Sequence, residues 1–215
     1  MPDMISALPA AGLMETWVLP VLLALGLAAA SGLRIFVPLF MAALAARFQL
    51  FGIELNDGML WMTSNTAIAA LGLATVIEVV SDKVPVLDNA LHAVGLIARP
   101  VAGAMVAGSM FVGLDPTAAA IAGIIVGAPT ALAFGAAQGG TRAASTLSTA
   151  GMANPFLSVV DDVLSIGTVL VAFLMPLLIP VVVLIGFLIV RAIYRHWRKG
   201  NAPTVMPELS ARRRT

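Results

Sequence analysis

Ala30-Ser31-Gly32-Leu33-Arg34 interrupts the first long apolar stretch of the chain, which runs from Trp17 to Arg47. As a single α-helix this stretch would be about 46 Å long, whereas the hydrocarbon core of a bilayer is about 30 Å thick. Small residues, an arginine and the nearby Pro38 stand in its middle. The sequence therefore predicts that a membrane helix is broken here, or that the chain turns back as a re-entrant hairpin.

The composition of the whole chain indicates an integral membrane protein. Of its 215 residues, 60% are hydrophobic and 11% are charged, against about 45–50% and about 25% in an ordinary soluble domain. So few charges cannot cover the surface of a soluble protein of this size. The chain has no cysteine, which excludes disulfides, thiolate metal sites and cysteine nucleophiles.

Four more apolar blocks follow the first, at residues 63–80, 90–112, 117–137 and 163–190. Each is long enough for a membrane helix. Residues 49–62 are mixed in polarity and predict a loop, and Asp115 or Thr117 is suited to cap the helix that follows. We therefore expect an all-α integral membrane protein with about five transmembrane helices, some of them broken or re-entrant.

The chain also contains a weak internal repeat. Two shifts superimpose residues of the same type: by 108 residues, Gly32 on Gly140 and Arg34 on Arg142; by 80 residues, Asp82 on Asp162 and Pro100 on Pro180. Each half then consists of a helix, a Gly-x-Arg break, a short helix, an acidic cluster and a proline-interrupted helix, with roughly 28 extra residues in the first half. Chance matching is the alternative, because sequences rich in Ala, Gly, Val and Leu align easily.

The repeat and the charge pattern divide the chain into four parts: an N-terminal segment (1–16), a first membrane repeat (17–112), a second membrane repeat (113–190) and a basic tail (191–215). The tail contains seven Lys or Arg and one Glu, giving +6, while the rest of the chain sums to −5. A basic segment after a membrane helix is typical of the cytoplasmic side, although it also suits nucleic acid or anionic lipid. With five spans the N-terminus would lie outside, and the two repeats would be inverted.

The two Gly-x-Arg sequences form the first half of a candidate site. Interrupted helices in repeated halves are typical of a transporter site near the membrane midplane. Unwound backbone needs polar partners there, and helix N-termini and arginines supply positive charge for an anionic group. The candidate residues are Ser31, Gly32, Arg34, Gly139, Gly140 and Arg142.

Acidic residues form the other half of the candidate site. Glu78 and Asp82 are four residues apart, as are Asp88 and His92, so each pair shares one face of a helix. With the remaining ionisable residues of the two repeats, the set is Glu78, Asp82, Asp88, His92, Arg99, Asp161 and Asp162. Four interpretations stay open: charge pairing within a functional cavity, a proton relay, purely structural ion pairs, and a divalent-cation site. We assign no metal ligand.

The sequence shows no sign of an enzyme. It lacks a Walker A loop, a Gly-x-Ser-x-Gly elbow and a His-Glu-x-x-His motif, and we expect no cofactor. The expected partners are the lipid bilayer and protons, ions or a small anionic solute, with no nucleic acid. A second copy of the chain is a further candidate partner, since Gly123-x-x-x-Gly127 matches a helix-packing motif, although close packing within the chain is the default interpretation of this motif.

Three motifs carry a resemblance to a known family. They are Ala30-Ser-Gly-Leu-Arg34 with Pro38, Glu78-Val-Val-Ser-Asp82-Lys-Val-Pro85-Val-Leu-Asp88-Asn-x-Leu-His92, and Arg99-Pro100 with Gly103. Over residues 18–190 the chain resembles the AciT-like family of small bacterial inner-membrane proteins, which carry a domain of unknown function. The resemblance implies a transporter linked to envelope integrity and intrinsic drug tolerance, with a signature set of Arg34, Glu78, Asp82, Asp88, His92 and Arg99. The tail after Arg198 lies outside it.

Two hypotheses of function follow. The first is a small inner-membrane transporter or channel-like protein that supports envelope homeostasis. Arg34 and Arg142 would hold an anionic group, while the carboxylates and His92 handle protons or cations. The second is a non-transporting membrane scaffold or lipid-binding protein whose central charges only lock the helices together. A lipid-modifying enzyme is a third class, but the sequence offers it no nucleophile constellation.

Overall fold

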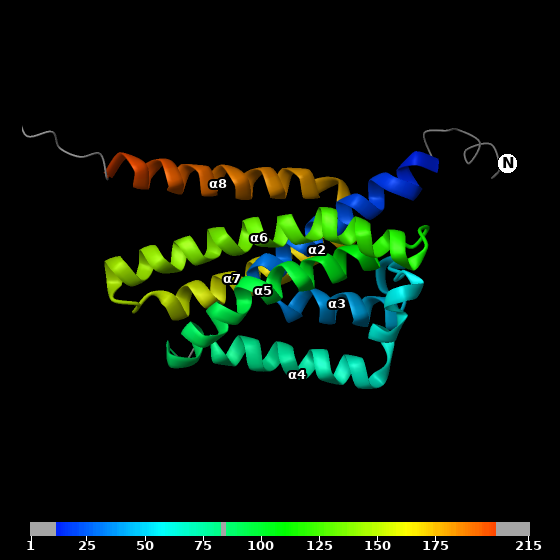
Figure 1. Cartoon of the computed structure of the whole chain (residues 1–215), viewed down its shortest axis with the longest axis horizontal. Helices are drawn as coiled ribbons and strands as arrows, with labels where there is room; N and C mark the ends of the chain where they lie inside the picture. Colours follow the sequence, from blue (N-terminus) through cyan, green and yellow to red (C-terminus); the bar gives the residue numbers. More distant parts are fainter. Residues whose placement is uncertain (1–11, 83–84, 201–215) are drawn as a thin grey trace, which may run out of the picture. The chain divides into compact units, whose positions relative to one another are not determined.

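The structure, a computed structural model, describes residues 12–82 and 85–200, without the side chains of residues 85–93 and of several residues after 188. Residues up to Val183 form one compact unit, which contains every predicted site residue, and later residues form a second. Within the described ranges all regular structure is helical, as the sequence predicted (Figure 1). The elements are η1 (Met14–Val18), α2 (Leu19–Leu33), α3 (Phe36–Arg47), η2 (Leu50–Gly52), η3 (Asp57–Thr63), α4 (Asn65–Ser81), α5 (Pro85–Ser109), α6 (Pro116–Thr149), α7 (Asn154–Leu174), η4 (Pro176–Leu178) and α8 (Ile179–Gly200).

Several of these helices are long and apolar enough to cross a bilayer, which indicates a membrane protein. By length and composition they are Met14–Leu33, Pro116–Thr149 and Asn154–Leu174, with a fourth if the bent pair Asp57–Thr63 and Asn65–Ser81 counts as one span. The shorter apolar helices are Phe36–Arg47, Val94–Ser109 and Pro176–Leu188, and they account for the rest of the apolar blocks in the sequence. Large apolar side chains such as Ile125 and Val163 are exposed, as expected for a surface that faces lipid.

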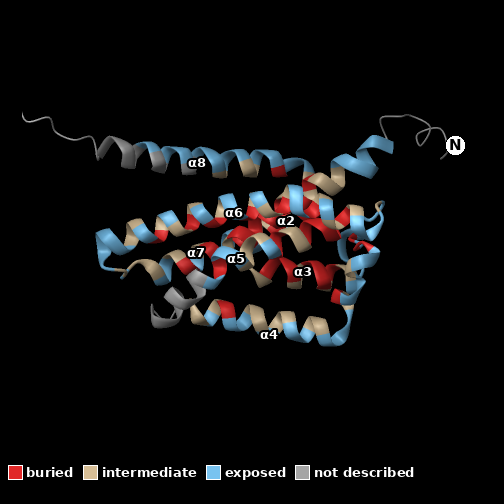
Figure 2. Cartoon of the chain, viewed as in Figure 1, coloured by how far each residue is buried: buried red, intermediate tan, exposed pale blue. Residues whose placement is uncertain are grey.

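Helix α2 is the central element of the first unit. It packs against α5, α6 and α7, and burial is concentrated in α2 and α3 (Figure 2). Its inner surface is built from small residues, which let neighbouring backbones approach closely. At Gly32 an added Cβ would lie 2.5 Å from the Ala131 carbonyl oxygen and 2.6 Å from Phe134 Cβ. Glycine is therefore required at position 32 by the crossing of α2 and α6.

Glycines also set the contact between α5 and α6, the most extensive helix pair. A Cβ on Gly127 would collide with the Gly103 carbonyl oxygen, and a Cβ on Gly108 would lie 3.0 Å from the Ala119 carbonyl oxygen. A Cβ on Gly123 would collide with Ala104. The Gly123-x-x-x-Gly127 motif is thus occupied by α5 of the same chain, and association with a second copy stays a prediction.

The break in the first apolar block is confirmed. Helix α2 ends at Leu33, Arg34 is extended at φ −134° and ψ 125°, and α3 begins at Phe36. Pro38 explains the position, because a proline lacks an N–H and its ring clashes with the carbonyl four residues earlier, here that of Arg34. With the helix restarted at Phe36, Pro38 lies in the first turn, where neither property is harmful.

The predicted break at Gly139 and Gly140 is wrong. Helix α6 continues through both residues to Thr149, and the chain turns only at Ala150 and Gly151, where φ is 52° and 83°. Glycine in a helix costs about 0.5–1 kcal/mol but does not end the helix by itself. No proline follows Gly140 within one turn; the next is Pro155, in the first turn of α7.

Two further expectations about helix ends also need correction. Helix α5 continues through Pro100, so the first half has no interruption there. Asp161 and Asp162 lie inside α7 and do not precede it, because α7 begins at Asn154. The break in the last apolar block comes at Met175, where the proline that follows starts a new helical turn.

The α5–α6 contact gives a test of the packing and of the continuous helix. Gly127→Ala should lower the unfolding temperature in detergent, because the added methyl group meets the Gly103 carbonyl oxygen and Ala107. Overpacking of this kind costs about 1–3 kcal/mol. The matched control is Gly140→Ala on the same helix, where nothing lies within 4 Å of an added Cβ, so stability should be unchanged or slightly higher.

Scanning fluorimetry of the two variants beside the natural protein provides the measurement. Equal unfolding temperatures for Gly127→Ala and the natural protein would refute the packing argument. A clear loss in Gly140→Ala would refute the continuous helix.

Candidate functional site

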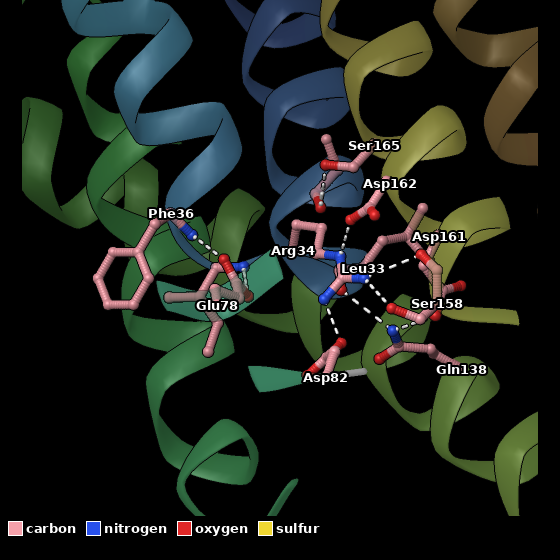
Figure 3. A network of polar contacts seen from close by, with 12 residues as sticks. Leu33, Arg34, Phe36, Glu78, Asp82, Gln138, Ser158, Asp161, Asp162 and Ser165 are labelled. Carbon is pink, nitrogen blue, oxygen red and sulfur yellow. Dashed lines mark hydrogen bonds and ion pairs between the residues drawn. The ribbon is translucent and has the colours of Figure 1, made fainter. Parts of the chain in front are cut away.

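A cluster of buried charges surrounds the break between α2 and α3, with Arg34 at its centre (Figure 3). The Arg34 side chain is 1% exposed and forms ion pairs with Asp82 and with Asp162, the latter at 2.7 Å. Its Nη2 also donates to the carbonyl oxygen and to Oγ of Ser158, both at 2.9 Å. The extended backbone at Arg34 thus directs its guanidinium toward α4 and α7.

Arg142 on α6 joins the same cluster from the other side. Its Nη2 donates to Asp82 Oδ2 at 3.0 Å and to Asp161 Oδ2 at 3.1 Å. Arg34 pairs with the same Oδ2 of Asp82. One carboxylate oxygen therefore bridges two guanidinium groups, and Asp82 links α4 to both α2 and α6. The two Gly-x-Arg arginines meet in space, as the sequence predicted, although only the first lies at a helix break.

Glu78 is the cap of α3. Its Oε1 accepts from the Ile35 backbone N–H at 2.7 Å, and its Oε2 accepts from the Phe36 backbone N–H at 3.0 Å. These are two of the amides that have no partner within α3 itself. A carboxylate at a helix N-terminus also interacts favourably with the helix dipole, so Glu78 stabilises the restart of the helix.

Side chains of α6 and α7 bond to carbonyl oxygens at the end of α2. Gln138 donates to the Leu33 carbonyl oxygen at 3.1 Å and to Asp161 Oδ2 at 2.6 Å. Ser165 Oγ donates to the Ala30 carbonyl oxygen at 3.2 Å. Gln138, Ser158 and Ser165 were not among the predicted site residues. Helical spacing was the available signal, since Gln138 is four residues before Arg142 and Ser158 and Ser165 flank the Asp161–Asp162 pair.

The remaining predicted site residues differ in their relation to the cluster. Ser31 and Gly32 are buried near the end of α2, and Gly32 packs against α6. Gly140 is exposed on α6 with open space beside it and Gly139 is half-buried, so the role of this glycine pair at the site stays a prediction. Asp88 and His92 lie in α5, but their side chains are outside the described set.

Arg99 lies on α5 beside the cluster but is not bonded to it. Its Nη1 donates to the Gly135 carbonyl oxygen at 3.3 Å, and its Nε is buried without a hydrogen-bond partner. Among the described side chains no carboxylate lies within ion-pair distance of Arg99, in contrast to Arg34 and Arg142.

A cavity of about 180 Å³ lies between this arginine and the cluster. Its charged lining consists of Glu78, Asp82, Arg99 and Arg142, and the rest of its wall is apolar. A larger cavity of about 670 Å³ at the loop after α3 contains none of the predicted site residues in its lining.

The described cluster combines four carboxylates with three guanidinium groups, namely Glu78, Asp82, Asp161 and Asp162 with Arg34, Arg99 and Arg142. Fully ionised, it has one surplus negative charge. Breaking a buried ion pair by removing one partner typically costs about 3–5 kcal/mol, since an uncompensated charge is left behind. Within the described part of the chain, no three His, Asp or Glu residues are grouped so as to hold a metal ion.

Glu78 offers a test of the site as a structural unit. Glu78→Ala should lower stability by about 1–3 kcal/mol, because the amides of Ile35 and Phe36 lose their acceptors. Glu78→Gln keeps an acceptor oxygen and should cost less. Glu54→Ala, which removes an exposed carboxylate, is the control. Unfolding temperatures in detergent that rank Glu78→Ala with Glu54→Ala would disprove the capping role.

Comparison with known proteins places the chain in a family. A family model described as a domain of unknown function, DUF4126, matches residues 21–195 and so includes every predicted site residue. No curated protein and no solved structure matches the chain. The match confirms the expected domain of unknown function, while bacterial origin and the AciT-like name stay predictions. Because most of the chain is matched, this protein belongs to the DUF4126 family.

Proposed function

We propose that this protein is a small membrane transporter whose charged centre responds to protons. The observation that carries the proposal is the position of Asp82, whose Oδ2 bridges Arg34 and Arg142 beside a cavity. A proton on Asp82 weakens both ion pairs in one step. Carboxylates in membrane helices are the usual carriers of protons in pumps and transporters.

The element that responds is α4. This helix packs chiefly on α3, and Asp82 at its C-terminal end connects it to α2 and α6. When the Asp82 bridge weakens, Arg34 keeps Asp162 and Arg142 keeps Asp161. The contacts with α7 therefore persist, and α4, still bonded to α3 through Glu78, is held less firmly to α2 and α6. Because Glu78 and Asp82 both line the cavity, movement of α4 changes access to it.

A scaffold is the second candidate function. It is favoured by the burial of Arg34, whose guanidinium bonds to three residues of two other helices. In a scaffold the same bonds only lock the helices around the break. The two functions differ in whether the centre exchanges protons or ions with water.

Proton flux in reconstituted vesicles separates the two. Vesicles containing the natural protein should acidify faster than empty vesicles under an imposed membrane potential. Asp82→Asn should reduce this flux about tenfold, because the amide cannot take up the proton. Asp57→Asn, which neutralises an exposed carboxylate outside the cluster, is the control and should leave the flux unchanged.

The absence of any flux of protons, cations or anions in the natural protein would sink the transporter proposal and favour the scaffold. Equal flux in Asp82→Asn and the natural protein would remove Asp82 from the mechanism.

We also place the protein in the bacterial inner membrane with a cytoplasmic C-terminus, where it supports envelope homeostasis. The proposal rests on the basic residues after 190, which the positive-inside rule assigns to the cytoplasm. Since the chain has no cysteine, Ser210→Cys provides a single label site. A membrane-impermeant maleimide should label it only after the membrane is opened, with the cysteine-free protein as the blank. Labelling in intact spheroplasts would reverse the orientation.

A further inference from the structure

We propose that the cavity beside Arg99 binds the head of an anionic amphiphile, a carboxylate or phosphate on an acyl chain. This inference rests on the proposed function, since it names the class of substrate that the transporter takes. It also stands on its own geometry: an arginine without an ion pair, a cavity with apolar walls, and an opening toward the lipid-facing surface.

The Arg99 guanidinium has an unused hydrogen-bond donor. Its hydrogen bond to the Gly135 carbonyl oxygen is long, at 3.3 Å, and its buried Nε has no hydrogen-bond partner. A guanidinium has five N–H donors and binds carboxylate or phosphate in a two-point arrangement. Because no described carboxylate lies within ion-pair distance of this half-buried guanidinium, its N–H groups can bind an anion.

The other charged residues of the cavity wall already have hydrogen-bond or ion-pair partners. Glu78 is engaged by the two backbone amides of α3. Asp82 is neutralised by two guanidinium groups, one of which belongs to Arg142, the other basic residue of the lining. Glu78, Asp82 and Arg142 therefore each have a described bonding partner on another helix, and Arg99 is the cation of the described lining that has no described carboxylate within ion-pair distance.

The size and polarity of the cavity also favour an amphiphile. Its remaining wall is formed by Ile35, Phe36, Ala74, Ile77, Val94 and Ala98. Its volume is about 180 Å³, and an apolar cavity of about 150 Å³ is known to hold a benzene-sized molecule. The space therefore suits a head group and a few methylene groups.

The exposed part of the lining indicates a route of entry. Ile77 and Val94 both line the cavity and are 52% and 61% exposed. In a membrane protein such exposed apolar residues contact acyl chains, so the cavity opens toward the bilayer between α4 and α5. An amphiphile can leave its chain among the lipids while its head reaches Arg99. An inorganic anion has no apolar group to contact the apolar wall.

Native mass spectrometry of the full-length protein in detergent tests the site. Four probes are offered separately: dodecanoate, phosphatidylglycerol, uncharged dodecanol and inorganic phosphate. We expect an adduct with dodecanoate or phosphatidylglycerol, and its mass tells a free fatty acid from a lipid head group. Dodecanol and phosphate should each bind about tenfold more weakly, because one lacks the charge and the other lacks the chain.

Variants then locate the adduct. Arg99→Gln should reduce amphiphile binding about tenfold, Arg99→Lys should restore part of it, and Ile77→Trp should reduce it by filling the opening. Arg47→Gln, which removes an exposed arginine outside this cavity, is the matched control and should bind as the natural protein does. Unchanged binding in both Arg99→Gln and Ile77→Trp, or dodecanol or phosphate adducts as abundant as those of the amphiphile, would overturn the proposal.

The two proposals fail in different ways. Proton flux in vesicles without any amphiphile adduct would reject the site and leave the transporter standing. An adduct that depends on Arg99, in a protein that moves neither ions nor the amphiphile across vesicle membranes, would keep the site and reject transport.

Discussion

The broken helix between α2 and α3 imposes the constraint on which the rest of the structure depends. A helix that ends inside a membrane protein exposes amides and carbonyls that find no water in the hydrocarbon region. Here Glu78 of α4 receives the amides of α3, and Gln138 of α6 and Ser165 of α7 serve the carbonyls of α2. Helices α4 and α6 therefore supply partners for the ends at the break, and α7 adds a second bond to the Ala30 carbonyl oxygen, which also accepts from the Arg34 N–H. The extended residue at the break carries the central arginine.

Close backbone packing makes this arrangement possible. The side chains of Gln138 and Ser165 reach the carbonyls of α2 because α6 and α7 lie close to it, and glycine at position 32 permits the crossing with α6. The α4 side of the cluster is packed less tightly, because the cavity lined by Arg99 and Asp82 lies there. The tight and loose sides of the centre suggest the division of roles that we propose: α2, α6 and α7 as the frame, and α4 as the responsive element.

A helix break was predicted at both Gly-x-Arg sequences, but only the first is broken, and the reason is physical. The first is followed by Pro38, whose ring and missing N–H force the helix to end near Arg34, so the break could be predicted from local sequence. The second has no such proline, and its glycines are accommodated within α6. The match of residue types at a constant spacing therefore correctly predicted that Arg34 and Arg142 belong to one site. It did not predict their backbone conformations, which differ. Gln138, Ser158 and Ser165 were missed because polar side chains of this size occur in many helices as harmless self-bonded groups, and only their neighbours give them a role.

The sequence by itself determined the all-helical, membrane-type composition, the first break, and the set of arginines and carboxylates that must compensate each other in an apolar environment. These depend on local sterics and on the cost of unpaired charge, which are properties of the residues themselves. The tertiary structure alone decided which charges pair: that Asp82 bridges Arg34 and Arg142, that Glu78 caps a helix, and that Arg99 faces a cavity without a described carboxylate partner. Pairing depends on which helices meet and at what distance, and in this chain that is set by glycine and alanine contacts spread over four helices.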